Sequence, residues 1–146
     1  VEMIEPNNAY FGEKDYQQLA IVRALVKELK SNVNIVGCAT VRETSGLAMS
    51  SRNERLTAEE KEAAALIFEA LNYVSNNKAN HSITELKNYF VDMVNSNPHL
   101  STEYIEISDS STLIPMEQWE EGVNLRAFTA VNIRDVRLID NVAIID

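Results

Sequence analysis

Residues 41–53 carry the groups best suited to hold a phosphate. Ser50 and Ser51 supply two hydroxyls, and Arg52 supplies a planar fork of N–H donors. Gly46, a few residues earlier, lets the backbone approach a ligand closely. Together these donors suit the oxygens of a phosphate group. A polar loop of Ser, Asn and Arg is also a common solvated loop, so this stretch by itself leaves both interpretations open.

A second polar run, residues 11–19, follows an apolar stretch and a glycine, Gly12. Lys14 stands where an ammonium group faces a phosphate, or it is an exposed lysine of a first helical turn. Asp15 can accept hydrogen bonds from ribose hydroxyls, and it also suits the positive end of a helix dipole. Gln18, one helical turn on, can bind a polar hydroxy acid through its amide or simply face solvent.

The elements around these runs are predicted to be strand, helix and strand. Residues 9–11 and 34–37 form short apolar strands, and a helix begins at Lys14 or Asp15 and ends near Lys30. This is the βαβ unit of a parallel sheet, in which ligands bind outside the carboxyl ends of the strands. Both polar runs follow a strand, so we expect them at the same sheet edge. The apolar face of the helix is predicted to comprise Leu19, Val22, Val26 and Leu29.

From Thr57 onward the pattern indicates a separate α+β region. Capping boxes at 57–60 and 82–85 open two amphipathic helices, which end near Ser75 and before Asn97-Pro98. Alternating apolar residues then predict strands at 104–108, 125–133 and 136–145, with Asp140-Asn141 interrupting the last. The expected fold class is α/β plus α+β, with domains at residues 1–55 and 56–146. The residues expected to face inward from the two helices are Ala63, Leu66, Ile67, Ala70, Leu71, Val74, Ile83, Leu86, Phe90, Met93 and Val94.

Composition limits the function classes. The 146 residues are 45% hydrophobic and 24% charged, as in ordinary globular proteins, and no apolar run approaches the roughly 20 residues of a membrane span. The net charge of −9 argues against a nucleic-acid surface. The single cysteine, Cys38, excludes an internal disulfide, is expected to be a small buried hydrophobe, and favours a cytoplasmic location. An anionic substrate would need local positive charge, which Lys14, Arg42, Arg52 and Arg55 supply in or beside the two runs.

The two histidines do not suggest a metal site or a nucleophile pair. His81 and His99 lie far apart in sequence, and neither has metal-ligand spacing with Cys38. The acidic run at residues 59–62 is best interpreted as a solvated helix face. We therefore expect no metal ligand from this chain.

Two runs closely resemble motifs of the pantothenate synthetase (pantoate–β-alanine ligase) family. They are Phe-Gly-Glu-Lys-Asp-Tyr-Gln-Gln-Leu at residues 11–19 and Gly-Leu-Ala-Met-Ser-Ser-Arg-Asn at residues 46–53, with Leu56-Thr57 shortly after. Looser similarity continues to residues 137–141, so the resemblance covers essentially the whole chain. One departure is Cys38-Ala39, where the family usually has an aliphatic residue and proline, and the loss of proline is expected to loosen the loop.

The resemblance implies an ATP-dependent ligase that condenses pantoate with β-alanine through pantoyl-adenylate. The α/β region would be the last strand–helix–strand unit of a doubly wound, Rossmann-like nucleotidyltransferase domain of the superfamily marked by a His-x-Gly-His sequence. ATP would bring the Mg²⁺, and the enzyme would be a cytoplasmic homodimer. By the same resemblance, Lys14, Ser50, Ser51 and Arg52 are catalytic and Gln18 contacts pantoate. The resemblance also assigns Val41 and Met49 to the adenine edge through backbone groups, although both could simply pack within the loop. The ATP-binding set is Gly12, Glu13, Lys14, Asp15, Val41, Met49, Ser50, Ser51 and Arg52.

The beginning of the chain suggests that a first half is missing. Residue 1 is a valine, and residues 1–6 look like the tail of a helix that runs into a turn. Neither histidine stands in a His-x-Gly-His motif. We therefore expect a carboxy-terminal half that is inactive by itself. The alternative is a non-catalytic nucleotide-binding or assembly module that retains the family motifs.

Overall fold

The computed structural model describes residues 6–145. They fall into two compact units that meet in sequence between Thr40 and Val41. This division comes earlier in the sequence than the predicted one, which followed Arg55. Residues 41–55 belong to the second unit because they are bonded to it through contacts described below. The predicted helix tail at residues 1–6 lies almost entirely outside the described residues.

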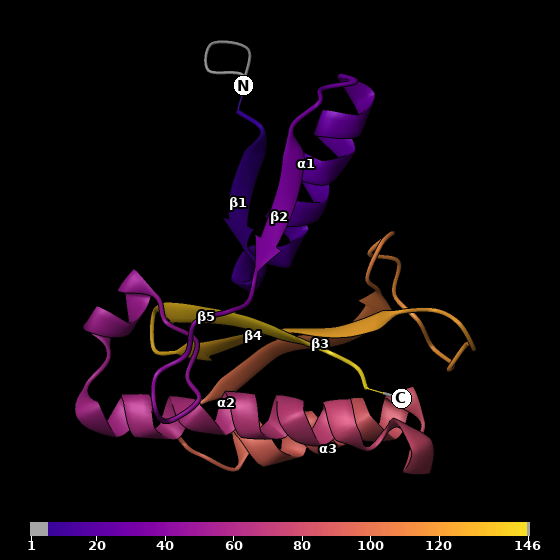
Figure 1. Ribbon diagram of the computed structural model, residues 1–146. Coiled ribbons are helices and arrows are strands. Elements are labelled where there is room, and N and C mark those ends of the chain that lie inside the picture. Colours follow the sequence, from indigo (N-terminus) through magenta and orange to yellow (C-terminus); the bar gives the residue numbers. More distant parts are fainter. Residues whose placement is uncertain (1–5, 146) are drawn as a thin grey trace. The chain divides into compact units, whose positions relative to one another are not determined.

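The first unit is the predicted strand–helix–strand arrangement (Figure 1). It consists of β1 (Asn8–Gly12), the 3₁₀ turn η1 (Glu13–Asp15), α1 (Tyr16–Glu28) and β2 (Asn34–Cys38). The two strands pair in parallel, with Gly12 opposite Cys38. The carboxyl ends of both strands therefore lie side by side, which confirms that part of the sequence prediction.

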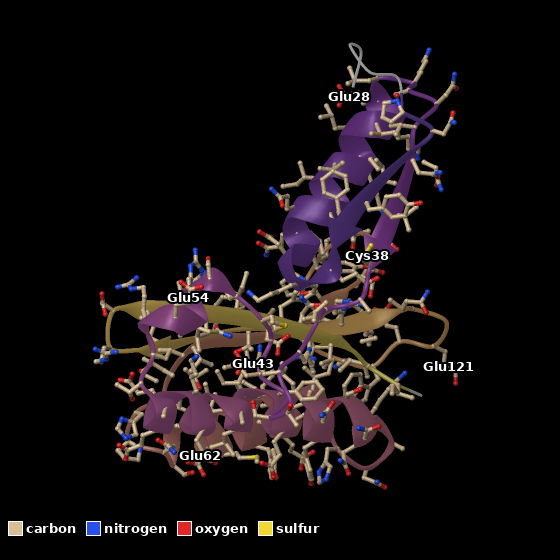
Figure 2. All side chains as sticks on the ribbon, turned by 60° about the vertical axis from the view of Figure 1, so that its left-hand side comes forward. Glu28, Cys38, Glu43, Glu54, Glu62 and Glu121 are labelled. Carbon is tan, nitrogen blue, oxygen red and sulfur yellow. The ribbon has the colours of Figure 1, made fainter. Side chains whose placement is uncertain are left out.

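Packing in the first unit differs from prediction at two residues. Leu19 of α1 is buried and Val22 and Val26 are partly buried, but Leu29 is 65% exposed. The prediction was wrong for Leu29 because α1 ends at Glu28, which leaves Leu29 as its C-cap. It was also wrong for Cys38, which is exposed at the end of β2 (Figure 2).

The second unit is the predicted α+β region. It contains η2 (Ser51–Arg55), α2 (Ala58–Asn76), η3 (Lys78–Asn80), α3 (Ile83–Asn95), β3 (Ser101–Asp109), β4 (Leu125–Ile133) and β5 (Val136–Ala143). The strands form an antiparallel sheet in the order β3-β4-β5, and Figure 1 shows α2 and α3 on the same face of it. Both predicted capping boxes form, at Thr57 and at Ser82. Within residues 6–145 no helix is long and apolar enough to cross a membrane.

One apolar core joins the two helices to the sheet. Burial of each large aliphatic or aromatic side chain contributes about 1.5–3 kcal/mol, so this core is the main source of stability in the second unit. The helix stripes predicted to face inward are confirmed. Fully buried members of the core include Leu71, Val74, Leu86, Phe90, Val94, Ile107, Val131, Ile133 and Val136.

The last strand is not interrupted at Asp140-Asn141. β5 continues from Val136 to Ala143 because both polar side chains find partners within the sheet or beside it. The Asp140 carboxylate accepts hydrogen bonds from Arg42 and from the Asn141 amide, and the Asn141 side-chain oxygen accepts one from Arg126. Satisfied polar groups do not break a strand, so the expected interruption was wrong.

Candidate functional site

A short β-hairpin, residues 41–49, precedes the predicted phosphate-binding residues. The Met49 amide donates to the Val41 carbonyl at 2.9 Å, and the Glu43 amide donates to the Leu47 carbonyl at 2.8 Å. Glu43 is labelled on this hairpin in Figure 2. These bonds make the approach to Ser50 a defined element rather than an open loop.

The hairpin turn requires glycine. Gly46 has a φ of +90°, in the left-handed region that L side chains avoid. A Cβ there would also lie 2.5 Å from Cδ1 of Phe68 on α2. Gly46 therefore sets the turn and lets the hairpin pack closely on α2.

The base of the hairpin presents an apolar pair to solvent. Val41 and Met49 lie opposite each other and are 67% and 53% exposed. Two neighbouring exposed apolar side chains suit the flat face of a base. The Met49 N–H and the Val41 carbonyl already bond each other across the hairpin. The predicted backbone contact with adenine would therefore have to use other backbone groups of these two residues.

Ser50, Ser51 and Arg52 follow directly. The Ser50 hydroxyl accepts from the Arg52 amide at 3.2 Å and caps η2. Ser51 and Arg52 are exposed, and Nη1 of Arg52 donates to the Arg137 carbonyl at 3.1 Å. The structure thus brings the three predicted phosphate ligands onto one turn, with Arg52 steadied by β5.

Asn53, which the sequence analysis did not single out, links the end of that turn to the hairpin. Its side chain is buried, and Nδ2 donates to the Ala48 carbonyl at 3.1 Å and to Oε1 of Glu43 at 2.9 Å. Its backbone amide donates to the Ser50 carbonyl at 3.0 Å. The available signal was its place at the end of the Ser-Ser-Arg-Asn run.

The hairpin is fastened to the sheet by an ion pair. Arg42 donates to both carboxylate oxygens of Asp140 at 2.6 and 2.9 Å, and its guanidinium carbon lies 3.7 Å from the centroid of the Phe68 ring. The side chains of Arg42 and Asp140 are 17% and 5% exposed. Sequence reasoning missed Asp140, although a lone carboxylate in an apolar strand was a usable signal.

The local positive charge is smaller than the sequence suggested. Arg42 pairs with Asp140, and Arg55 pairs with Asp135. Two of the four cations expected to attract an anionic substrate are therefore neutralised by carboxylates. Both side chains are engaged within the second unit, which reduces their predicted contribution to the field around a substrate.

A second group of predicted ligands lies at the carboxyl end of β1. Gly12 ends the strand and Lys14 is partly buried in η1. The Asp15 carboxylate accepts from the backbone N–H of Gln18 at 3.4 Å. Asp15 is thus the N-cap of α1, as one of its two interpretations required. A Cβ on Gly37 of β2 would lie 3.0 Å from a carboxylate oxygen of Glu13, which places the Glu13 side chain over that strand. The predicted convergence of this group with residues 50–52 on one ligand stays a prediction.

The strand that steadies Arg52 is itself held by an ion pair between Arg137 and Glu103. Arg137, whose carbonyl accepts from Arg52, donates to Glu103 at 2.8 and 3.1 Å. These hydrogen bonds hold the pKa of Glu103 below its usual range and raise that of Arg137. Between residues 6 and 145, no group of three or more His, Cys, Asp or Glu side chains is placed to hold a metal ion.

Comparison with known proteins now identifies the family. The family model described as pantoate-beta-alanine ligase matches residues 1–143. The chain belongs to this ligase family. A pantothenate synthetase from Christiangramia forsetii is 44% identical over 143 residues, which are 98% of this chain and 50% of that protein. The chain spans about half the length of the curated relatives it matches.

Solved structures of the family share the fold. The pantothenate synthetase of Thermus thermophilus matches with a TM-score of 0.90 and 36% identity, over 99% of this chain and 52% of that one. A pantoate-beta-alanine ligase from Francisella tularensis, complexed with beta-gamma ATP and beta-alanine, matches with a TM-score of 0.68 and 34% identity, over 97% and 45%. The α/β unit followed by an α+β unit is therefore confirmed as the family's fold.

Proposed function

We propose that this chain provides ATP-binding and catalytic residues of a ligase that joins pantoate to β-alanine. The observation that carries the proposal is the hairpin, which presents the exposed pair Val41 and Met49 directly before Ser50, Ser51 and Arg52. An apolar surface beside hydroxyl and guanidinium donors matches a nucleoside beside its phosphates. Membership in the ligase family supports the same ligand.

The reaction has two steps. The pantoate carboxylate attacks the α-phosphorus of ATP, which forms pantoyl-adenylate and releases pyrophosphate. The amine of β-alanine then attacks the acyl carbon, which forms pantothenate and releases AMP. Both steps depend on positioning and on neutralising negative charge more than on a strong base.

Each predicted residue has a role suited to that chemistry. The hydroxyls of Ser50 and Ser51 and the guanidinium of Arg52 donate to phosphate oxygens, and the Lys14 ammonium neutralises charge that develops at the α-phosphorus. Asp15 accepts from ribose hydroxyls and Gln18 binds pantoate, while Gly12 and Glu13 complete the nucleotide site. Mg²⁺ would enter with the phosphates and offset their charge.

ATP binding tests the proposal on the chain itself. Isotope-labelled chain is titrated with ATP and Mg²⁺, and amide shifts at Met49, Ser51 and Arg52 are expected to saturate together. Arg52→Ala should weaken the affinity about tenfold, as for loss of a charge-assisted phosphate contact, whereas Arg55→Ala should not. Binding that leaves these amides unmoved would refute the nucleotide site.

Catalysis is tested in a chimera in which this chain replaces the matching half of the Thermus thermophilus enzyme. AMP release that requires pantoate, ATP and β-alanine together supports the ligase, and Lys14→Ala should lower the rate about a hundredfold. The chain by itself should release no AMP, because it carries no His-x-Gly-His sequence. A chimera that binds ATP but forms no AMP would favour the non-catalytic module. We also propose a cytoplasmic homodimer, which family membership supports. Sedimentation of the chimera would test the dimer.

A further inference from the structure

Arg42 contacts three different parts of the second unit. Its guanidinium bonds both oxygens of Asp140 on β5 and stacks on Phe68 of α2. Nη1 also donates to the Gly46 carbonyl at the hairpin turn, at 3.1 Å. One side chain therefore joins the hairpin to a strand and a helix that lie far from it in sequence.

The hairpin in turn holds both ends of the phosphate-binding residues. Met49, immediately before Ser50, is bonded to the Val41 carbonyl, and Asn53, immediately after Arg52, is bonded to the Ala48 carbonyl. Ala48 pairs across the hairpin with Arg42. A displacement of Arg42 would thus move the residues on either side of Ser50–Arg52.

We propose that Arg42 is the positioning residue of this ligase's phosphate-binding turn. This inference rests on the proposed function. Through Asp140, Phe68 and Gly46, Arg42 fixes the hairpin, and the hairpin fixes the turn in the form that meets the ATP phosphates. Arg42 would act without contacting the nucleotide, because its guanidinium is already engaged by Asp140, Gly46 and Phe68. Its planar fork is essential, because a single ammonium cannot bond two carboxylate oxygens and a carbonyl while stacking on a ring.

Arg42→Lys separates positioning from stability. Lysine keeps a positive charge beside the buried Asp140 carboxylate, so urea unfolding followed by Trp119 fluorescence should stay close to that of the parent chain. Amide exchange at Glu43, Met49 and Asn53 should accelerate about tenfold while the amides of α3 are unchanged. Arg55→Lys is the matched control, because Arg55 forms an exposed pair with Asp135 just past the same turn.

A double variant removes the pair without leaving a buried charge. Arg42→Met with Asp140→Asn keeps the side-chain volumes and should expose the same hairpin amides. Hairpin exchange within about twofold of the parent chain in both variants would overturn the proposal. So would accelerated exchange spread evenly over the whole second unit, since that is loss of stability and not of position.

ATP affinity distinguishes this inference from the function on which it rests. If the parent chain binds ATP, Arg42→Lys should raise the Kd about tenfold, and an unchanged Kd would overturn the positioning role. If the parent chain gives no amide shifts with ATP and Mg²⁺, the proposed nucleotide site fails. The exchange comparison still decides whether Arg42 holds the hairpin, because it needs no ligand.

Discussion

Gly46→Ala should destabilise the second unit more than the same change at Gly122. Both glycines have positive φ angles, +90° and +76°. A Cβ on Gly122 would meet no heavy atom within 4 Å, whereas a Cβ on Gly46 would lie 2.5 Å from Cδ1 of Phe68. The two substitutions therefore share a backbone cost and differ in a steric one.

The magnitudes follow from those two costs. An L-residue in the left-handed region costs about 1–2 kcal/mol, which applies at both positions. Overpacking adds about 1–3 kcal/mol where neighbours cannot yield. Phe68 is such a neighbour, because the Arg42 guanidinium lies over its ring and is itself held by Asp140. Gly46→Ala should thus lower the free energy of unfolding by about 2–5 kcal/mol and Gly122→Ala by about 1–2 kcal/mol.

Urea unfolding followed by Trp119 fluorescence measures both losses. Trp119 is the chain's single tryptophan, and its indole N–H donates to the His81 carbonyl in the second unit at 2.7 Å. Adding Phe68→Leu to Gly46→Ala should recover part of the steric loss, which would appear as a favourable coupling energy. Equal losses at Gly46 and Gly122 would show that the ring yields and that the hairpin is not tightly packed.

Three further outcomes are expected. The pKa values of Glu60 and Glu85 are held below their ordinary value of 4.5, chiefly by the backbone N–H groups of the Thr57 and Ser82 caps. Because the folded pKa is lowered, the stability that these two carboxylates contribute is present at neutral pH and is lost as the pH falls from about 4.5 through the folded pKa. Glu60→Gln should reduce the loss of unfolding free energy at acid pH in urea titrations, and an unchanged pH profile would contradict this prediction. Phe90→Ala should cost about 3–5 kcal/mol in urea unfolding, since the ring is fully buried in the core, and a loss below about 1 kcal/mol would show a core that collapses around the gap. Amides of residues 14–37 should exchange faster than those of 83–94, because among residues 6–40 only Leu19 and Val33 are buried apolar side chains; equal protection in a chain that sediments as a monomer would refute this.

The sequence predicted most where the determining interactions are local. The capping boxes at Thr57 and Ser82 and the helix stripes depend on residues three or four apart, and both helices form as expected. The parallel pairing of β1 and β2 followed from the length of the helical connection between them. The expected break in β5 failed because a distant partner decides. Asp140 lies within β5 because its carboxylate is bonded to Arg42. That partner is 98 residues away in sequence, so a local pattern does not reveal it.

The candidate site shows the same division between ligand groups and the residues that hold them. The motif run identified Ser50, Ser51 and Arg52 because hydroxyls and a guanidinium have recognisable chemistry. It could not show that Arg42, in the same stretch, faces a carboxylate instead of a substrate, since side-chain type does not reveal direction. Burial shows that Arg42 is not placed for a substrate, because its side chain is 17% exposed and lies beside an Asp140 side chain that is 5% exposed. A cation so placed cannot contribute much to the field met by an incoming anion. With Arg55 also paired, a nucleotide bound at the proposed site of this chain, whose net charge is −9, would rely on Arg52 and on the Mg²⁺ that travels with its phosphates.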